Sequence, residues 1–356
     1  MARELSDDEV RRSRVAAQLL HRPGRGPAIA DLVGRLVAVQ AQDIGAAPLA
    51  LRVRSRGLTA ADVAAAREDR SIVRAWGPRG TLHLVATNDL PWLGPLFGPQ
   101  WINHSLRRLA QEGVMGTTAE LVRVTDRALA GQGPLTKAQL GERLAKLGRP
   151  AKGQGIVHLA ALAAAHGKVV LGPDRAGKPT YVLAADWLPS QPPPDNDRGR
   201  ALAELARRYL RAHAPAGPED LAAWSGLGLG DARAAWATVG SELTEVRHRD
   251  RPLWRARRGG PRPADVPVSL LPAFDEYLLG WRDRGLIVAD AHARTVLPGG
   301  GILRPAVLAH GRVVGTWRVI RRPGADAVAA NLFKESDGID GEALRAEADD
   351  VARFAG

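Results

Sequence analysis

Apolar residues recur at helical spacing along the first part of the chain, three or four positions apart. The pattern predicts helices at about residues 7–21 and 29–41. Ser6 or Asp7 is placed to cap the first helix, because these side chains accept hydrogen bonds from the free N–H groups of a first turn. The N-terminal part of the chain is therefore expected to be helical.

The next segment combines a helix with two strands. The residues LTAADVAAAREDR predict a helix that begins after Thr59. SIVRAW and TLHLVA are short runs typical of strands, and the turn GPRG separates them. A helix followed by a two-stranded wing is typical of a winged-helix unit.

The same order of elements recurs twice further along the chain. Residues 117–187 predict three helices followed by the strands KVVLG and PTYVLAA. Residues 198–256 predict three helices followed by ELTEVRHRD and RPLWRAR. Because GPLTKAQLGERL and AGPEDLAAWSGL occupy the same place in the two repeats, we expect three winged-helix units in tandem.

The composition of the chain changes toward its C-terminus. The proline run in residues 191–200 can continue neither a helix nor a strand and indicates a linker. After Pro261, the segments VPVSLLP, GLIVAD, PAVLAHG and RVVGTWRVIRR predict short strands, and residues 340–353 predict a last helix. The expected fold is α+β, with three tandem winged-helix units and a small β-rich C-terminal domain. The predicted domains are 1–115, with the N-terminal helices and first winged helix, 116–190, 198–260 and 261–356.

Charge and composition narrow the class of protein. The 356 residues include 50 Lys and Arg against 38 Asp and Glu, a net charge of +12, and most of the cations are Arg. Arg suits bidentate contacts with phosphates and guanine edges, which favours a nucleic-acid partner, although a GC-rich genome also enriches Arg. The absence of Cys excludes disulfides, thiol nucleophiles and thiolate zinc sites. With no long apolar run and an acidic start, the chain is expected in the cytoplasm, associated with the nucleoid and away from membranes.

The densest basic stretch is RHRDRPLWRARRGGPR at residues 247–262. As the third wing it could follow a phosphate backbone, and Arg255, Arg257 and Arg258 are candidate DNA contacts. Arg52 and Arg54 are further candidates, since they share a face if that segment is extended. The alternative is an ordinary solvated turn in an Arg-rich protein.

Two glutamines stand out in GRLVAVQAQDIGAAP. Gln40 and Gln42 close an apolar helical pattern where Lys or Glu would be usual. Residues two apart do not face each other on a helix, so their amides can converge only if the backbone leaves helical geometry near Gln40. Ile44, Gly45 and Pro48 favour such an exit. The alternative is that Gln42 caps the helix and Gln40 is a surface residue.

Two adjacent carboxylates, Asp275 and Glu276, follow an apolar strand in LLPAFDEYLLGWRDR. Asp275 is a candidate acid, base or water-positioning group. The alternative is a buried lattice of Asp and Arg that orients the C-terminal domain. The nine His show no metal-ligand spacing, so no metal is expected.

Four motifs in order resemble one known family. VQAQD near residue 40, WGPRGTLHLV at 76–85, LLPAFDEYLLGWRDR at 270–284 and PAVLAHGRVVGTWR at 305–318 are similar to the AlkZ/YcaQ superfamily of bacterial winged-helix DNA glycosylases. The resemblance spans nearly the whole chain. It implies three tandem winged helices in a C shape, completed by a β-barrel-like domain that carries a hairpin.

The resemblance also implies a site. The family's catalytic motif is Gln, an apolar residue, then Gln or Asp, which matches Gln40, Ala41 and Gln42 and places the chain with the AlkZ branch. Asp43 is an additional candidate if the loop register differs. The implied DNA contacts lie on the hairpin, at Arg304, His310 and Arg312, and we add Arg79 and His83 from the WGPRGTLHLV motif.

The expected function is that of a monofunctional DNA glycosylase. The resemblance implies excision of N7-alkylated guanine, including bulky adducts and interstrand crosslinks, in repair or in self-resistance to an alkylating toxin. No Lys precedes Lys137, so Schiff-base chemistry has no support. We expect a monomer that needs no cofactor and acts on double-stranded DNA containing alkylated purines. The alternative is a non-catalytic winged-helix DNA-binding protein or regulator.

Overall fold

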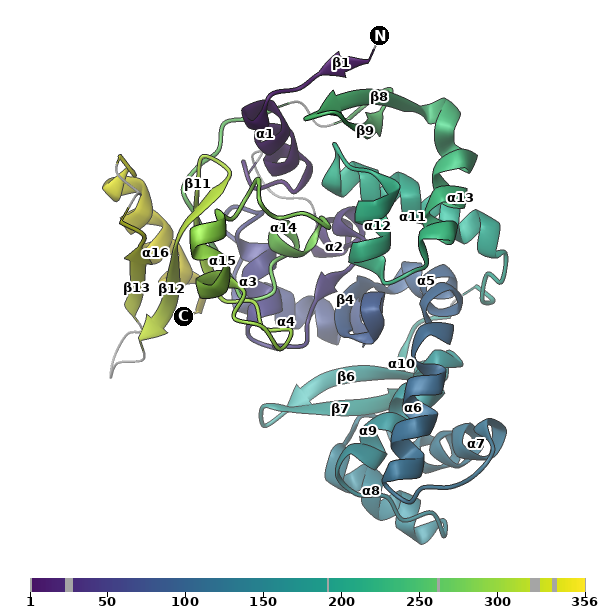
Figure 1. Cartoon of the computed structure of the whole chain (residues 1–356). Helices are drawn as coiled ribbons and strands as arrows, with labels where there is room; N and C mark the ends of the chain where they lie inside the picture. Colours follow the sequence, from purple (N-terminus) through teal and green to yellow (C-terminus); the bar gives the residue numbers. More distant parts are fainter. Residues whose placement is uncertain are drawn as a thin grey trace. The chain divides into compact units, whose positions relative to one another are not determined.

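The chain forms two compact units in the computed structural model (Figure 1), which describes residues 2–22, 28–190, 192–260, 263–320, 327–334 and 338–355. One unit combines Met1–Val63 with Ala203–Gly356, and the other is Ala64–Leu202. We call them the split unit and the inserted unit. Their boundaries differ from those of the four predicted domains, because residues 64–115 belong to the same compact unit as the predicted second domain.

The inserted unit contains one antiparallel sheet and a cluster of helices. Its helices are η1 Pro78–Gly80, η2 Thr87–Asp89, α5 Leu90–Phe97, α6 Pro99–Gln111, α7 Thr118–Leu129, α8 Lys137–Lys146, α9 Gly153–Ala165 and α10 Ala184–Trp187. Its strands are β3 Ile72–Trp76, β4 Leu82–Ala86, β5 Leu135–Thr136, β6 Val169–Arg175 and β7 Lys178–Leu183, which lie in the order β4-β3-β6-β7-β5. The strands SIVRAW and TLHLVA are thereby confirmed as β3 and β4, which pair antiparallel.

The predicted order of three helices and two strands is present in this unit. Thr117 and Thr136 begin α7 and α8 with capping boxes, in which the N-cap hydroxyl and the residue three positions later exchange hydrogen bonds. The helices bury Leu140, Leu159 and Leu162 in one apolar core with the β6–β7 hairpin. Figure 1 shows this hairpin beside α9.

The split unit contains the remaining elements. Its helices are α1 Asp7–Ala17, α2 Ile29–Leu36, α3 Ala46–Arg52, α4 Ala60–Glu68, α11 Arg198–His213, α12 Pro218–Ser225, α13 Leu229–Val239, η3 Gly240–Glu242, α14 Glu276–Leu279, α15 Asp290–Val296 and α16 Gly341–Ala355, with α4 and α11 crossing the boundary between units. Its strands are β1 Arg3–Glu4, β2 Val39–Gln40, β8 Leu243–His248, β9 Arg251–Ala256, β10 Ser269–Leu271, β11 Ala306–Ala309, β12 Arg312–Ile320 and β13 Ala327–Leu332.

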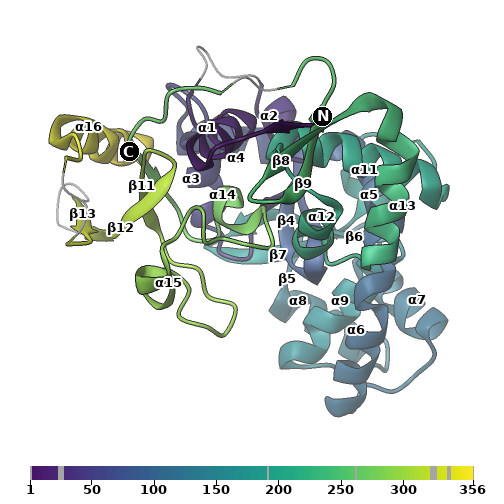
Figure 2. The same cartoon turned by 45° about the horizontal axis from the view of Figure 1, so that its top comes forward.

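The helices and strands of the third predicted unit, residues 198–256, are also present, as α11, α12, α13 and the β8–β9 hairpin. The N-terminal strand β1 adds to this hairpin, parallel to β8, as Figure 2 shows. Ser6 then caps α1 with a capping box that includes Glu9, so of the two predicted caps, Ser6 and Asp7, the structure shows Ser6. Leu5 and Val10 bury their side chains against Val246, Leu253 and Leu286.

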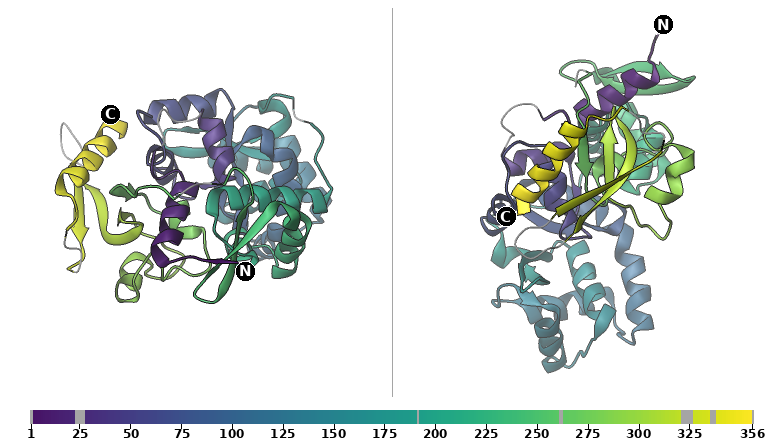
Figure 3. Two further views of the ribbon diagram at one scale, coloured as in Figure 1. Left: turned by 90° about the horizontal axis from the view of Figure 1, so that it is seen from above. Right: turned by 90° about the vertical axis from the view of Figure 1, so that its left-hand side faces the viewer.

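The C-terminal part is an open four-stranded sheet in the order β10-β11-β12-β13. Within the described residues this sheet does not close, which corrects the expectation of a β-barrel-like domain, since four strands are fewer than the five or more of small barrels. The apolar segment GLIVAD is a turn and not a strand, because the carbonyl of Arg284 accepts the N–H groups of both Ile287 and Val288. The last helix is confirmed as α16, which lies along the sheet in both views of Figure 3.

A two-residue turn joins β11 to β12. His310 and Gly311 both have positive φ, of 50° and 72°, as a tight hairpin turn requires. Gly311 suits this position, because left-handed backbone costs it nothing and an added Cβ would lie 3.0 Å from the Arg11 side chain. Strands β11 and β12 therefore form a hairpin where the resemblance implies one, near Arg304, His310 and Arg312. Across the described residues, no helix is long and apolar enough to span a bilayer.

Candidate functional site

The two glutamines lie where the chain has left helical geometry. Helix α2 ends at Leu36, five residues before the predicted end at 41, and Val37 has a φ of 72°. Gln40 is in the short strand β2 and its side chain is 7% exposed. The interpretation of Gln40 as a surface residue on a helix is therefore wrong, and Gln42, which lies in a bend, does not cap α2.

A buried carboxylate fixes the backbone of Gln40. The N–H of Gln40 donates to Oε1 of Glu276 at 2.8 Å. The other oxygen, Oε2, accepts from the indole Nε1–H of Trp224 at 2.9 Å. Glu276 is fully buried, and each of its two oxygens accepts a hydrogen bond. It therefore holds the first glutamine in place through the main chain.

The neighbouring carboxylate, Asp275, is part of a second buried network. Its two oxygens accept from Nη1 and Nη2 of Arg54, each at 2.8 Å. Arg54 also donates to Oε1 of Gln18 and to the carbonyl of Ala50, both at 2.7 Å. The Asp275 Oδ1 atom accepts the N–H of Tyr277 at 2.9 Å and so caps α14. Its partners are thus an arginine and the first turn of a helix.

These contacts correct three of the predicted sites. Asp275 and Arg54 are both fully enclosed, so the buried Asp–Arg lattice describes Asp275 better than an acid or base does. Arg52 is also buried, where it donates to Asp350 at 2.8 Å and to Glu347 at 3.2 Å. A guanidinium that is buried and paired with carboxylates has no free surface for a phosphate, so neither Arg52 nor Arg54 is a DNA contact in this structure.

The remaining part of the motif is exposed. Ala41 is buried, whereas Gln42 and Asp43 face solvent. Asp43 Oδ1 accepts the N–H of Gly45 at 2.9 Å, a local turn that leads into α3. The motif thus presents one buried and one exposed glutamine from a single non-helical segment.

Arg79 and His83 belong to the inserted unit. Arg79 is half-buried in the β3–β4 turn, with a positive φ of 58°. His83 is fully buried on β4, and its Nδ1 lies 3.0 Å from the Thr81 carbonyl. Burial lowers the pKa of His83 to about 3, so the ring is neutral near pH 7 and cannot supply a cation to DNA. This corrects the prediction for His83.

The other candidate DNA contacts lie at the surface of the split unit. Arg257 and Arg258 are exposed at the end of the β8–β9 hairpin, and Arg255 is half-buried on β9. The end of the basic stretch, at 261–262, lies outside the described residues. Arg304, His310 and Arg312 are all exposed, the first before β11 and the other two at the hairpin turn.

Two residues of this site, Glu276 and Trp224, are recognised only in the structure. Glu276 was visible as a carboxylate inside an otherwise apolar run, but nothing local paired it with Gln40, which is 236 residues away. Trp224, at the end of α12, carried no signal beyond its aromatic character. Among the described residues, no group of three or more His, Asp or Glu is arranged to hold a metal ion.

Comparison with known proteins identifies the family. Residues 33–354 match the family described as DNA glycosylase AlkZ-like. A curated protein of Streptomyces sahachiroi, described as an interstrand DNA cross-link repair glycosylase, is 29% identical over 356 residues, covering 94% of this chain and 92% of that protein. The solved structure of the Streptomyces sahachiroi DNA glycosylase AlkZ is similar with a TM-score of 0.80 and 27% identity, covering 99% of this chain and 97% of that one. The resemblance seen in the motifs is thereby confirmed, and the chain belongs to the AlkZ-like family of DNA glycosylases.

Proposed function

We propose that this protein is a monofunctional DNA glycosylase that removes N7-alkylated guanine from double-stranded DNA. Family membership supports the reaction class, and the relative described as a cross-link repair glycosylase supports bulky adducts and interstrand crosslinks as substrates. We propose that the protein acts as a monomer on nucleoid DNA in the cytoplasm. Gln40 and Gln42 are the proposed catalytic residues, with Asp43 as the third candidate.

The chemistry of the lesion explains why two amides can suffice. A carboxamide cannot accept a proton usefully at pH 7, so it is a poor general base. An N7-alkylated purine, however, already carries a positive charge and leaves C1′ as a neutral base. The enzyme then needs only to position water and to stabilise the developing oxocarbenium ion, which the oxygen dipoles of two amides can do. A neutral pair also spares undamaged purines, which need stronger catalysis to leave.

The observation that carries this proposal is the fixed, non-helical backbone at Gln40. The Q-x-Q segment follows Val37, whose left-handed backbone ends α2, and its first N–H is bound by the buried carboxylate of Glu276. A fixed backbone favours catalysis by the amides, because a small displacement of an amide oxygen would weaken its hold on the attacking water. We propose that Glu276 is a positioning residue that acts through the main chain of Gln40.

We propose that the duplex is held by basic groups that are exposed or half-buried. These include the wing residues Arg255, Arg257 and Arg258, the hairpin residues Arg304, His310 and Arg312, and Arg79 on the β3–β4 turn. The three helix-and-hairpin repeats are proposed as winged helices on the order of their elements. Such contacts with the phosphate backbone hold DNA without reading its sequence.

The direct test is excision from alkylated DNA. We expect the full chain to release 7-methylguanine from methylated duplex and to unhook a nitrogen-mustard crosslink. Gln40→Ala and Gln42→Ala should each lower the single-turnover rate by at least about 100-fold, the lower end for loss of a catalytic group, while the affinity for duplex is unchanged. Gln132→Ala is the matched control, because Gln132 is an exposed glutamine that precedes β5 in the inserted unit. Wild-type rates in both variants would show that the site is misassigned.

The same experiment distinguishes a glycosylase from the alternative, a non-catalytic DNA-binding protein. A winged-helix regulator would bind a particular duplex sequence with both glutamines replaced and would release no base from any alkylated substrate. Absence of base release by the wild-type chain, together with sequence-specific binding, would favour that alternative.

A further inference from the structure

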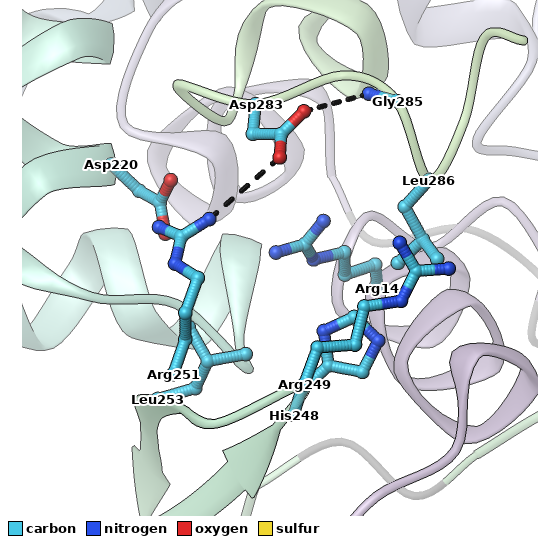
Figure 4. Close-up of a pocket in the computed structure, with 9 residues that line it drawn as sticks. All are labelled: Arg14, Asp220, His248, Arg249, Arg251, Leu253, Asp283, Gly285 and Leu286. Atoms are coloured by element: carbon cyan, nitrogen blue, oxygen red, sulfur yellow. Dashed lines mark hydrogen bonds and ion pairs between the residues drawn. The ribbon is translucent and has the colours of Figure 1, made fainter.

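Three arginines line a small pocket of the split unit. It lies between α1, the β8–β9 hairpin and the loop after α14, and Figure 4 shows its lining. Three arginines and a histidine line it, together with two carboxylates; these are Arg14, His248, Arg249, Arg251, Asp220 and Asp283. None of these residues is a proposed catalytic group.

Arg14 is the unusual member of this group. Its side chain is only 6% exposed, and its guanidinium lies over the Trp281 ring, 4.4 Å from the centroid. Its Nε donates to the carbonyl of Pro215 at 3.3 Å. Within the described residues, neither Nη atom of Arg14 has a hydrogen-bond acceptor, and no carboxylate lies within ion-pair distance of it. Burial lowers the pKa of Arg14, which shows that its charge is partly desolvated.

The carboxylates of the pocket have other partners. Both oxygens of Asp220 accept backbone N–H groups, from Gly217 and from Arg282, each at 3.0 Å. Asp283 accepts the N–H of Gly285 and lies 3.8 Å from Nη1 of Arg251. These contacts leave the forked Nη groups of Arg14 facing the pocket without a directly bound anion.

The other basic side chains of the pocket differ in their contacts with carboxylates. Arg249 forms an ion pair with Asp7 on α1, and Nε2 of His248 lies 2.8 Å from Oδ1 of the same carboxylate, so both side chains already have a partner. Arg251 is at the rim, with about half of its side chain exposed, and has only the distant contact with Asp283. Arg14 at the bottom and Arg251 at the rim are thus the groups that an incoming anion can reach. In Figure 4 both guanidinium groups extend into the space that the labelled residues enclose.

We propose that this pocket binds a phosphate group, with Arg14 as its buried anchor and Arg251 as its rim contact. A guanidinium fork pairs with two oxygens of a phosphate at once, which suits an arginine whose two Nη groups have no acceptor. The source of the phosphate is either the backbone of bound DNA, which rests on the proposed function, or a free phosphate, which does not.

Two measurements on the full chain distinguish these sources. The first is the melting temperature in inorganic phosphate against chloride at equal ionic strength. The second is the slope of log affinity against log salt for an undamaged duplex, whose magnitude falls by about one for each backbone phosphate that the protein no longer binds. The variants are Arg14→Gln and, because removal of a buried arginine can impair folding, Arg251→Gln at the exposed rim. Arg233→Gln is the control, an exposed arginine on α13 outside the pocket.

A backbone phosphate predicts a salt slope lower by about one in both pocket variants and unchanged in the control. A free phosphate predicts instead that phosphate stabilises the wild type and the control but not the pocket variants, with equal salt slopes. If the pocket variants match the wild type in both measurements, the proposal is wrong. If the wild type binds no duplex, the proposed function fails while the phosphate measurement still decides whether this pocket binds phosphate.

Discussion

Glu276 accepts a hydrogen bond from the backbone N–H of Gln40, with 2.8 Å between the nitrogen and Oε1. This bond joins the start of α14 to the Q-x-Q segment across 236 residues of chain. Because the carboxylate is buried and also accepts from Trp224, its position is set by two donors. The backbone of the proposed site therefore depends on a residue that acts on Gln40 through a main-chain hydrogen bond.

Replacing this carboxylate should slow excision without weakening DNA binding. In Glu276→Gln one amide oxygen can serve only one of the two donors, and the NH₂ group faces the other. We expect the single-turnover rate of 7-methylguanine release to fall about 10- to 100-fold, the range typical of residues that orient the groups of a site without reacting themselves. The affinity for the same duplex should be unchanged, because Glu276 is fully buried and offers no group to DNA.

A milder variant and a control accompany Glu276→Gln. Trp224→Phe removes one donor and leaves the bond to Gln40, so a smaller loss of rate is expected. Glu342→Gln changes an exposed glutamate in the first turn of α16 and should leave the rate unchanged. A full wild-type rate in Glu276→Gln would mean that Gln40 does not need this anchor.

The Arg54–Asp275 pair should act on stability and not on chemistry. Asp275→Asn leaves a buried guanidinium without its bidentate partner, and loss of one member of a buried pair costs about 3–5 kcal/mol. We expect a lower free energy of unfolding in urea and a normal excision rate per folded molecule. The double variant Arg54→Met with Asp275→Asn should recover part of the loss, because it removes the unpaired charge.

The exposed pair Arg12–Asp265 serves as the control for this experiment. Asp265→Asn should change the free energy of unfolding by less than about 1 kcal/mol, as exposed ion pairs generally do. If the folded Asp275→Asn protein were inactive, Asp275 would again be a catalytic candidate.

Stability should fall in mild acid because of buried histidines. Burial lowers the pKa of His213 to about 3, against an ordinary value of 6.5. Between these values the unfolded chain binds a proton that the folded chain does not, so stability falls as the pH drops below 6.5. The expected loss is about 2–3 kcal/mol for this group by about pH 4.5, at roughly 1.4 kcal/mol per unit.

The contribution of His213 can be isolated by substitution. In His213→Asn an amide N–H can still donate to the Tyr209 carbonyl, which lies 3.1 Å from Nδ1, and no titrating group remains. Urea unfolding is measured from pH 7 to 4.5. The free energy of unfolding should fall less steeply with falling pH in this variant, because the unfolded chain binds about one proton fewer. Gln132→Ala, which changes an exposed residue that does not titrate, should keep the wild-type slope. Equal slopes in all three proteins would show that His213 titrates normally.

Gly280 should tolerate no side chain. A Cβ at this position would lie 2.4 Å from Cδ2 of His213 and 3.0 Å from the carbonyl of Glu276. Gly280→Ala should thus lower the free energy of unfolding by about 1–3 kcal/mol, as overpacking does. Gly230→Ala is the control, because an added Cβ in α13 meets nothing within 4 Å, and alanine should preserve or slightly raise stability. Equal melting temperatures for Gly280→Ala and the wild type would contradict the packing around His213.

Local patterns in the sequence were sufficient for most of the secondary structure. The capping boxes of α1, α7 and α8 and the strand–turn–strand pattern of β3–β4 involve residues only a few positions apart, so they are readable along the chain. GLIVAD was misread because an apolar run is equally compatible with a buried turn. The end of α2 was placed too late, since Val37 gives no local sign of its left-handed backbone.

The charged residues were harder to assign. Arg14, Arg52 and Arg54 were indistinguishable by composition from the exposed arginines of the basic stretch. One signal existed for Arg14, which follows Val10 by four positions and so shares its buried helix face. No such signal existed for Arg54, whose carboxylate partner is 221 residues away.

The sequence by itself determined the helices, the repeated helix-and-hairpin order, the Q-x-Q motif and, through four motifs, the family. Each of these depends on residue type and short-range spacing, which the chain carries directly. Only the tertiary structure decided which carboxylates support the motif, which arginines are buried and which of them has no directly bound anion. These depend on contacts between distant segments, because the free energy of a buried charge is set by the partners that folding brings to it.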